Sequence, residues 1–241
     1  MSRAQVIPWL QTALPALLLV LPGSALWLAV APTKGAFVGW VLMMAVLGTV
    51  AAIVAGADLA AGRPHRWLAL AGIGGVLFVL LLILKLVVWA EAGWREAAWT
   101  AGVAASWAAL WGMLAWALRH RGAGVAIGAS LGLASACMAL PVAAMPGMRW
   151  AGHWGYTDGV VSVWQGRAVE VVSHACPFFA LLSALKPAVG VDWGAQPGMY
   201  AWSGLGQEVP LELPEPWVCG MIYAGLTAAV WLVCRRGATS A

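Results

Sequence analysis

Long apolar runs, separated by short polar turns, make up most of this chain. Crossing the hydrocarbon core of a bilayer takes about 20 helical residues, and six runs suit that length: Ile7–Val30, Ala36–Leu59, Trp67–Ala90, Ala97–Leu118, Val125–Met145 and Trp217–Val233. Only 9% of the residues are charged, against about 25% in ordinary soluble domains. The sequence therefore predicts an all-α, polytopic membrane protein with six transmembrane helices, multi-pass in a bacterial-type inner (plasma) membrane.

Arginine positions predict the orientation of these helices, because short loops rich in Lys and Arg stay on the cytoplasmic side. In the six-helix arrangement, one side of the membrane receives Arg3, Arg63, Arg66, Arg119, Arg121, Arg235 and Arg236. Both termini are therefore expected to be cytoplasmic. The formal net charge of +4 follows from this topology and requires no nucleic-acid partner.

Residues 146–216 form the one long stretch that is not a hydrophobic run. We expect Pro146 and Gly147 to end the fifth helix. The chain then divides into helices one to five (1–145), an extracytoplasmic insert (146–216), and the sixth helix with a cytoplasmic tail (217–241).

The insert is expected to contain one amphipathic helix, from about Val160 to Leu185, with a kink at Pro177. Its apolar face would consist of Val171, Ala175, Phe178, Leu182 and Leu185. Lys186 and Pro187 are expected to end it. A helix of this kind, lying beside the outer membrane face, suits a lid or a docking surface.

Glycines recur in several runs at spacings that place them on one side of a helix. Gly124, Gly128 and Gly132 form a doubled small-xxx-small repeat, and the second run contains Gly48 and Gly56. Small residues let two helix backbones approach closely within a membrane. The repeat from Gly124 is expected either to hold the bundle together internally or to face a partner subunit.

Trp107 and Trp111 lie in the middle of the fourth run, four residues apart and therefore on one helix face. Their rings can stack on a ligand such as a quinone-like ring, or they can pack against helices and lipid. Lys85 is a second ligand candidate, because ionisable groups within membrane helices are often functional. Its place near the outer end of the third run also lets it snorkel towards water.

Groups suited to catalysis or metal binding are few. Glu170 and His174 are spaced to share a helix face, so Glu170 could orient His174. Candidate metal ligands are His153, His174 and Cys176. None of these residues falls in a compact motif such as CxxC or HExxH, and the sequence has no phosphate-binding or dinucleotide fingerprint. We therefore predict no cofactor and no metal.

Cys176 and Cys219 both fall on the predicted outer side of the membrane, in a compartment that permits disulfides. A bond between them would tie the helix of the insert to the start of the sixth membrane helix. The alternative is two free thiols, which the sequence alone does not exclude. Cys137 and Cys234 are expected to be free.

Two classes of function fit these features. The first is a non-catalytic membrane subunit of a larger transport or energy-transducing assembly, because buried charge is scarce and the cytoplasmic loops are short. The second is a permease with its cavity under the insert. Six helices with both ends inside and a helical insert before the last one resemble, in topology, the permease subunits of type-2 ABC exporters, which implies a separate ATPase.

A membrane-surface enzyme, or a metal- or haem-handling protein, is a third class, and it would depend on His174 with Glu170 or Cys176. Scarce charge and the lack of a ligand motif place it behind the other two. The partners expected from the sequence are the lipid bilayer, other membrane subunits and, in the exporter case, the separate ATPase.

Overall fold

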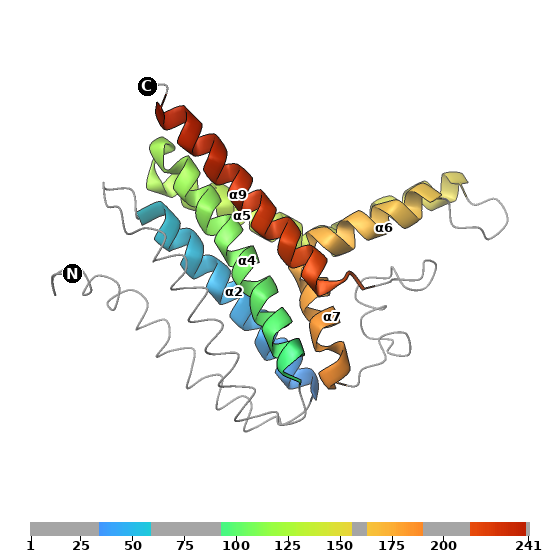
Figure 1. Cartoon of the computed structure of the whole chain (residues 1–241). Coiled ribbons are helices and arrows are strands. Elements are labelled where there is room, and N and C mark those ends of the chain that lie inside the picture. The colour runs from blue at the N-terminus through green and yellow to red at the C-terminus, as the bar shows by residue number, and fades with distance from the viewer. Residues whose placement is uncertain (1–33, 59–92, 156–162, 190–212, 240–241) are drawn as a thin grey trace. The chain divides into compact units, whose positions relative to one another are not determined.

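The computed structural model describes residues 34–58, 93–155, 163–189 and 213–239. Every regular element in these ranges is a helix (Figure 1): α2 (Lys34–Asp58), α4 (Trp94–Leu118), the 3-10 helix η2 (Arg119–Arg121), α5 (Ala123–Gly155), α6 (Val163–Ala175), α7 (Pro177–Val189) and α9 (Pro216–Thr239). The all-α class is thereby confirmed for this part of the chain. The expected helices Ile7–Val30 and Trp67–Ala90 lie outside the described residues, and so does Lys85.

Three of the described helices are long and apolar enough to cross a membrane: Trp94–Arg121, Ala123–Leu140 and Pro216–Arg235. They overlap the expected fourth, fifth and sixth spans. The apolar segment of α2, Val41–Ala57, is shorter. These helices support a membrane protein, while the count of six spans and their orientation remain predictions.

The chain divides into two compact units, Met1–Leu47 and Gly48–Ala241. In the first unit, the described residues form the beginning of α2. The second unit contains the rest of α2 and all the other described helices. Helices α4, α5, α6, α7 and α9 contact one another within this second unit.

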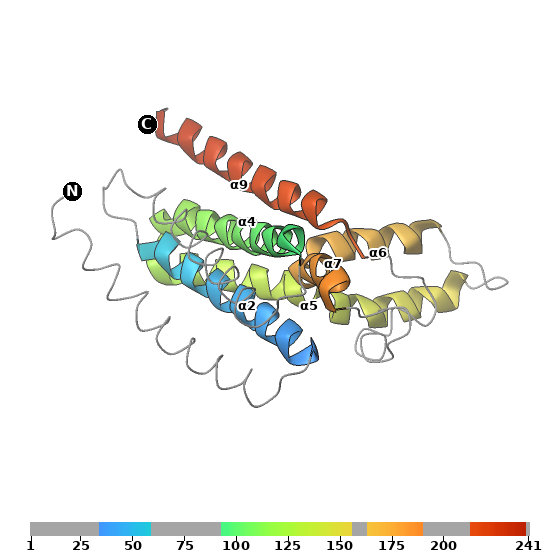
Figure 2. The same ribbon diagram turned by 60° about the horizontal axis from the view of Figure 1, so that its bottom comes forward.

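Helix α4 is the central helix of the second unit and contacts α9, α7 and α5. In its most apolar stretch 56% of the residues are buried, against 17% in α5 and 11% in α9. Helix α9 runs beside α4 in the same direction (Figures 1 and 2), with Gly220 next to Ser106 and Tyr223 next to Trp107. Helix α4 is thus a core helix, whereas α5 and α9 keep much of their apolar surface uncovered.

The turn between α4 and α5 is short and basic. After η2, Gly122 adopts a φ of 104°, a conformation that glycine accepts without steric cost. Its N–H donates to the Arg119 carbonyl at 3.0 Å, and its own carbonyl accepts from the Ala126 N–H at 3.0 Å. These two bonds close α4 and start α5, which folds back along α4 as an antiparallel neighbour.

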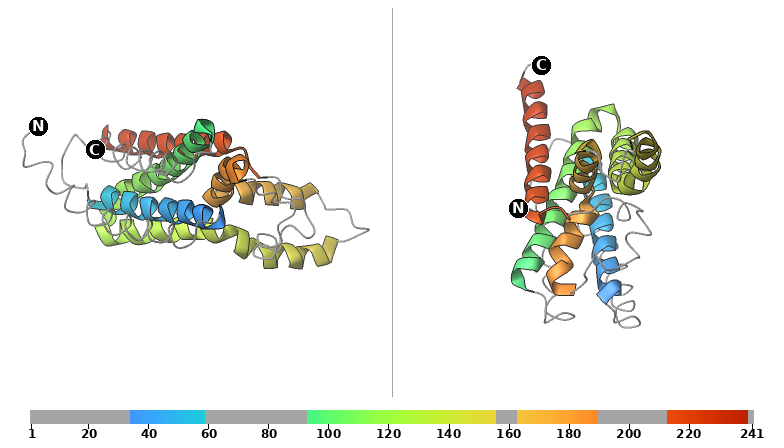
Figure 3. Two further views of the ribbon diagram at one scale, coloured as in Figure 1. Left: turned by 90° about the horizontal axis from the view of Figure 1, so that it is seen from below. Right: turned by 90° about the vertical axis from the view of Figure 1, so that its right-hand side faces the viewer.

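Helix α5 is longer than expected, because it continues through Pro146 and Gly147 to Gly155. The prediction that these two residues end the helix is wrong. A proline removes one backbone N–H, and within a run of alanines and other helix formers this bends a helix without ending it. Figure 3 shows α5 changing direction along its length, and α5 also contacts α6.

The single kinked helix expected from Val160 to Leu185 is also corrected. The structure has two helices, with Cys176 between them and Pro177 as the first residue of α7. Proline fits the first turn of a helix and disfavours helical backbone in the residue before it, so here it starts a helix. Nor do Lys186 and Pro187 end α7, which continues to Val189.

The break separates the two halves of the expected apolar face. Leu182 and Leu185 of α7 are only 2% and 4% exposed, whereas Val171 of α6 is 68% exposed. Helix α7 packs against α4, and α6 extends beside α5 (Figure 1). The insert therefore contributes a short buried helix to the bundle, in place of the continuous amphipathic helix expected on the outer surface.

Candidate functional site

Trp107 and Trp111 of α4 and Tyr223 of α9 form a buried group that we call the aromatic cluster. The ring centroids of Trp107 and Trp111 lie 5.2 Å apart with their planes inclined by 72°. Those of Trp107 and Tyr223 lie 5.0 Å apart, inclined by 66°. In this edge-to-face arrangement, the positive edge of one ring meets the negative face of the next. The cluster joins the central helix to the last helix of the chain.

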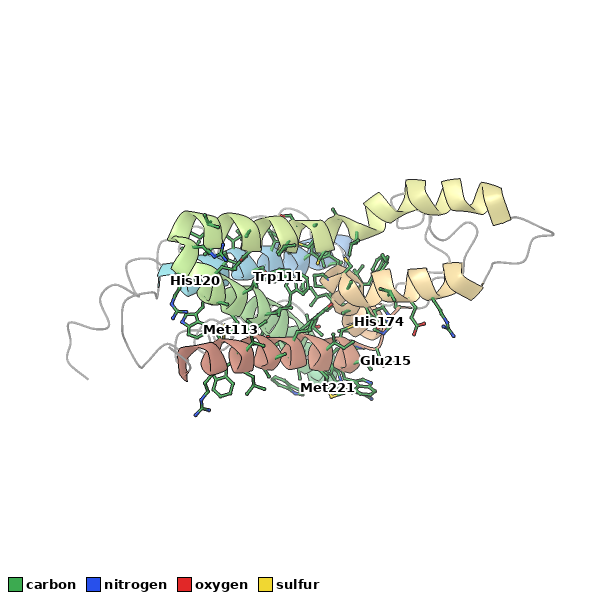
Figure 4. The ribbon with its side chains drawn as sticks, turned by 90° about the horizontal axis from the view of Figure 1, so that it is seen from above. Trp111, Met113, His120, His174, Glu215 and Met221 are labelled. Carbon is green, nitrogen blue, oxygen red and sulfur yellow. The ribbon has the colours of Figure 1, made fainter. Side chains whose placement is uncertain are left out.

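The sequence placed both tryptophans on one helix face but did not identify Tyr223 as their neighbour. Its signal was a lone tyrosine within an apolar run, three residues after Gly220. Gly220 lies close to Ser106, which lets α9 approach α4 at this level. Figure 4 shows Trp111 in the middle of the bundle, with His120 towards one end and His174 and Glu215 towards the other.

Four buried side-chain polar atoms of α4 and α5 make no hydrogen bond within the described structure. They are the indole Nε1 atoms of Trp107, Trp111 and Trp116 and the hydroxyl of Ser130. A buried donor without a partner costs about 1–3 kcal/mol. The indoles of Trp107 and Trp111 can therefore donate to an acceptor such as a carbonyl oxygen. The unpartnered indoles favour the ligand interpretation of the tryptophan pair, and the edge-to-face ring contacts favour the packing interpretation.

Tyr223 also fixes the junction between α6 and α7. Its hydroxyl donates to the carbonyl of His174 at 2.8 Å, near the end of α6, where helix carbonyls lack intrahelical partners. On the other side of the junction, the Cys176 thiol lies 3.8 Å from the carbonyl of Met138 in α5. The break between α6 and α7 is thus held to both α9 and α5.

His174 is held by main-chain atoms. Its Nδ1 lies 2.7 Å from the backbone carbonyl of Glu170, so Nδ1 carries the proton in this hydrogen bond. The carboxylate of Glu170 is not the partner in this bond, and Glu170 and Arg167 are both exposed. This geometry orients the ring of His174, but it does not form the pair of side chains that the spacing predicts.

A metal centre finds little support among the described residues. Within these ranges, no group of three His, Cys, Asp or Glu side chains is placed to hold a metal ion. Helix α5 includes His153, whose side chain is outside the description. The candidate ligands His174 and Cys176 therefore remain sequence-based predictions.

Cys176 and Cys219 are free and buried, at 1% and 0% exposed. The disulfide stays a prediction, which peptide mapping under non-reducing conditions decides: a linked peptide would confirm it, and two free thiols would agree with the structure. Cys137 and Cys234 are free as well.

Cys176 is expected to react slowly with alkylating reagents while the protein is folded. Burial raises the pKa of this thiol to about 11, so at pH 8 only about one molecule in a thousand carries the reactive thiolate. Timed alkylation followed by peptide mass analysis should show Cys176 at least about tenfold slower than the partly exposed Cys234. The rate at Cys176 should rise with pH up to about 11. Equal rates for the two thiols in folded protein would contradict the burial of Cys176.

Three glycines of α5, Gly124, Gly128 and Gly132, do not pack against the described residues of the second unit. Gly124, Gly128 and Gly132 are exposed, and a Cβ built on any of them meets open space. The buried face of α5 consists instead of Ala126, Ser130 and Ala134, at 0%, 0% and 2% exposed. Sequence reasoning missed this face, although it too repeats small residues at four-residue steps. We call the exposed set the glycine stripe.

Comparison with protein-family models, with curated proteins and with solved structures found no significant match for this chain. The described structure offers a buried aromatic cluster in which two indole donors have no partner, and an exposed glycine stripe on a long apolar helix.

Proposed function

We propose that this chain is a non-catalytic membrane subunit of a larger membrane-embedded assembly, and that a helix of a partner packs on the glycine stripe. The observation that carries the proposal is the open space at Gly124, Gly128 and Gly132. Between lipid tails, helices gain no hydrophobic free energy by associating, so close backbone contact at small residues is a main source of affinity.

The surroundings of the stripe support the same proposal. Val125 and Leu133, its neighbours on α5, are 56% and 51% exposed. In the most apolar stretch of α5, only 17% of the residues are buried. A partner helix could therefore bury both the glycines and the side chains that flank them, as in other small-xxx-small contacts.

Replacing Gly128 by leucine is expected to lower the yield of co-purified partner at least about tenfold, because a large side chain keeps the helices apart. The full-length chain should be extracted at native abundance in mild detergent, and its companions should be identified by mass. Folding should persist, because the position faces open space.

The matched control is Gly225→Leu on α9, which is also exposed and open, and which should keep the partner. Wild-type protein that purifies as a lone monomer would refute the subunit proposal. An ATPase among the companions would turn it towards the exporter type of assembly.

The second candidate is a permease, favoured by the aromatic cluster. Two unpartnered indole donors at mid-helix could hold a substrate that offers hydrogen-bond acceptors. Replacing Trp107 and Trp111 should then abolish transport. This result supports a permease only if the variant protein still folds.

A further inference from the structure

Basic residues gather at one end of the α4–α9 pair. The two helices run in the same direction, with Tyr223 beside Trp107. Arg119 follows Trp107 by as many residues as Arg235 follows Tyr223, so the two arginines lie at the same end of the helix pair (Figures 1 and 2). Arg121 lies at this end as well. At the opposite end, near the starts of these helices, Glu96 and Glu215 outnumber Arg95. The pair is therefore electrically polarised along its length.

Two of these arginines stack on tryptophans. The guanidinium carbon of Arg119 lies 4.2 Å from the ring centre of Trp116, and that of Arg235 lies 5.3 Å from the ring centre of Trp231. Tryptophan prefers the depth of the lipid headgroups in a membrane. A stacked guanidinium keeps the N–H groups at its edge, where they can form paired hydrogen bonds with a phosphate.

The other contacts of these arginines leave charge at the surface. Arg119 donates from one Nη to the carbonyl of Trp116 at 2.6 Å, which satisfies one of the terminal carbonyls of α4. The Nε of Arg121 donates to Nε2 of His120 at 3.3 Å, and this pair is exposed. Arg235 is also exposed. Arg121 and Arg235 are therefore the arginines most accessible to a headgroup.

Apolar surface continues directly from this basic end. On α9, Leu226, Leu232 and Val233 are 49%, 45% and 71% exposed. Leu232 precedes Arg235 by three residues and therefore lies on the same side of α9. A phospholipid can thus place its phosphate near the guanidinium groups and its acyl chains along α9, which a free phosphate ion cannot do.

We infer that this basic end, formed by Arg119, Arg121 and Arg235, binds the phosphate headgroups of anionic phospholipids whose acyl chains lie along the exposed face of α9. Each arginine near an anionic membrane surface contributes an attraction equivalent to about fivefold in affinity. The inference does not depend on a partner subunit, and it stands apart from the glycine stripe.

The test uses the full-length chain in mild detergent, titrated with phosphatidylglycerol or with zwitterionic phosphatidylcholine, with bound lipid counted by native mass spectrometry. Wild-type protein should bind phosphatidylglycerol at least about fivefold more tightly. The double variant Arg121→Gln with Arg235→Gln should lose this preference. Arg95→Gln, which removes one positive charge at the other end of α4, should keep it.

One further pair of substitutions and one competing ligand test the alternatives. The double variant Arg121→Lys with Arg235→Lys preserves the charge and should retain most of the preference, which excludes loss of folding as the cause. Glycerol phosphate, which has no acyl chains, should not displace phosphatidylglycerol. The inference is overturned by equal affinity of the wild type for the two lipids. It is also overturned by an equal effect of Arg95→Gln, or by displacement with glycerol phosphate, which would indicate a site for soluble phosphates.

Discussion

Replacing Gly56 by leucine is expected to destabilise the second unit by about 3 kcal/mol. A Cβ on Gly56 would overlap the carbonyl oxygen of Gly112 in α4 and would lie 2.9 Å from its carbonyl carbon. Ala52 and Ala108, one turn earlier on each helix, form a matching buried contact. Main-chain atoms cannot rotate away as side chains do, so the two helices would have to separate.

The measurement is the thermal unfolding of purified full-length protein in mild detergent. Gly102→Leu on α4 is the control, because Gly102 is exposed and has no atom within 4 Å of its built Cβ. This control should unfold close to the wild-type temperature, and Gly56→Ala should fall between the two. If Gly56→Leu were no less stable than Gly102→Leu, the close approach of α2 and α4 at Gly112 would be disproved.

Replacing Trp107 by alanine is expected to cost about 3 kcal/mol, at the low end for a buried tryptophan. We expect a destabilisation at the low end of this range because unfolded membrane helices remain in lipid. The substitution therefore removes mainly packing contacts and little hydrophobic free energy. Trp107 is 2% exposed and contacts both Trp111 and Tyr223. The cavity would loosen α9, and through the Tyr223 hydroxyl it would also weaken the hold on the α6–α7 junction.

Two companion variants separate packing from ligand binding. Trp99→Ala removes a tryptophan of α4 that is 38% exposed, and it should leave the unfolding temperature nearly unchanged. Trp107→Phe keeps an aromatic ring but removes the unpartnered N–H. If the indole only packs, this variant should fold and function almost normally. Normal folding with lost transport would favour the permease over the subunit.

The arrangement of the helices bears on both proposals. Helix α4 is enclosed by α9, α7 and α5, whereas the stretches Ala123–Leu140 of α5 and Pro216–Arg235 of α9 are mostly unburied. A subunit would use one such side for a partner helix and the other for lipid. In the proposed subunit, the glycine stripe on α5 would face the partner helix, and the basic end that includes Arg235 of α9 would face lipid.

The insert forms two helices, α6 and α7, in place of the one expected helix, and this changes how it could act as a lid or docking surface. The expected single helix would have been free to move over the membrane face. The structure instead holds the α6–α7 junction by Tyr223 and Cys176 and buries α7 against α4. Any movement of α6 relative to the bundle would have to take place around this fixed junction.

Local composition was enough to predict the all-α class and the approximate positions of α2, α4, α5 and α9. In lipid each backbone polar group needs a partner within its own segment, so a long apolar run has little choice but a helix. The arginines at the ends of α4 and α9 were likewise read from the sequence, although the orientation that they predict remains a prediction.

Contacts between distant residues were decided only by the tertiary structure. Two stripes of small residues occur on α5, and periodicity alone does not tell that Ala126, Ser130 and Ala134 pack while the glycine stripe stays open. Pro177 can kink a helix or start one, and the choice follows from where α7 can be buried. The pairing of Tyr223 with Trp107 depends on the direction and depth at which α9 meets α4, which no local pattern encodes.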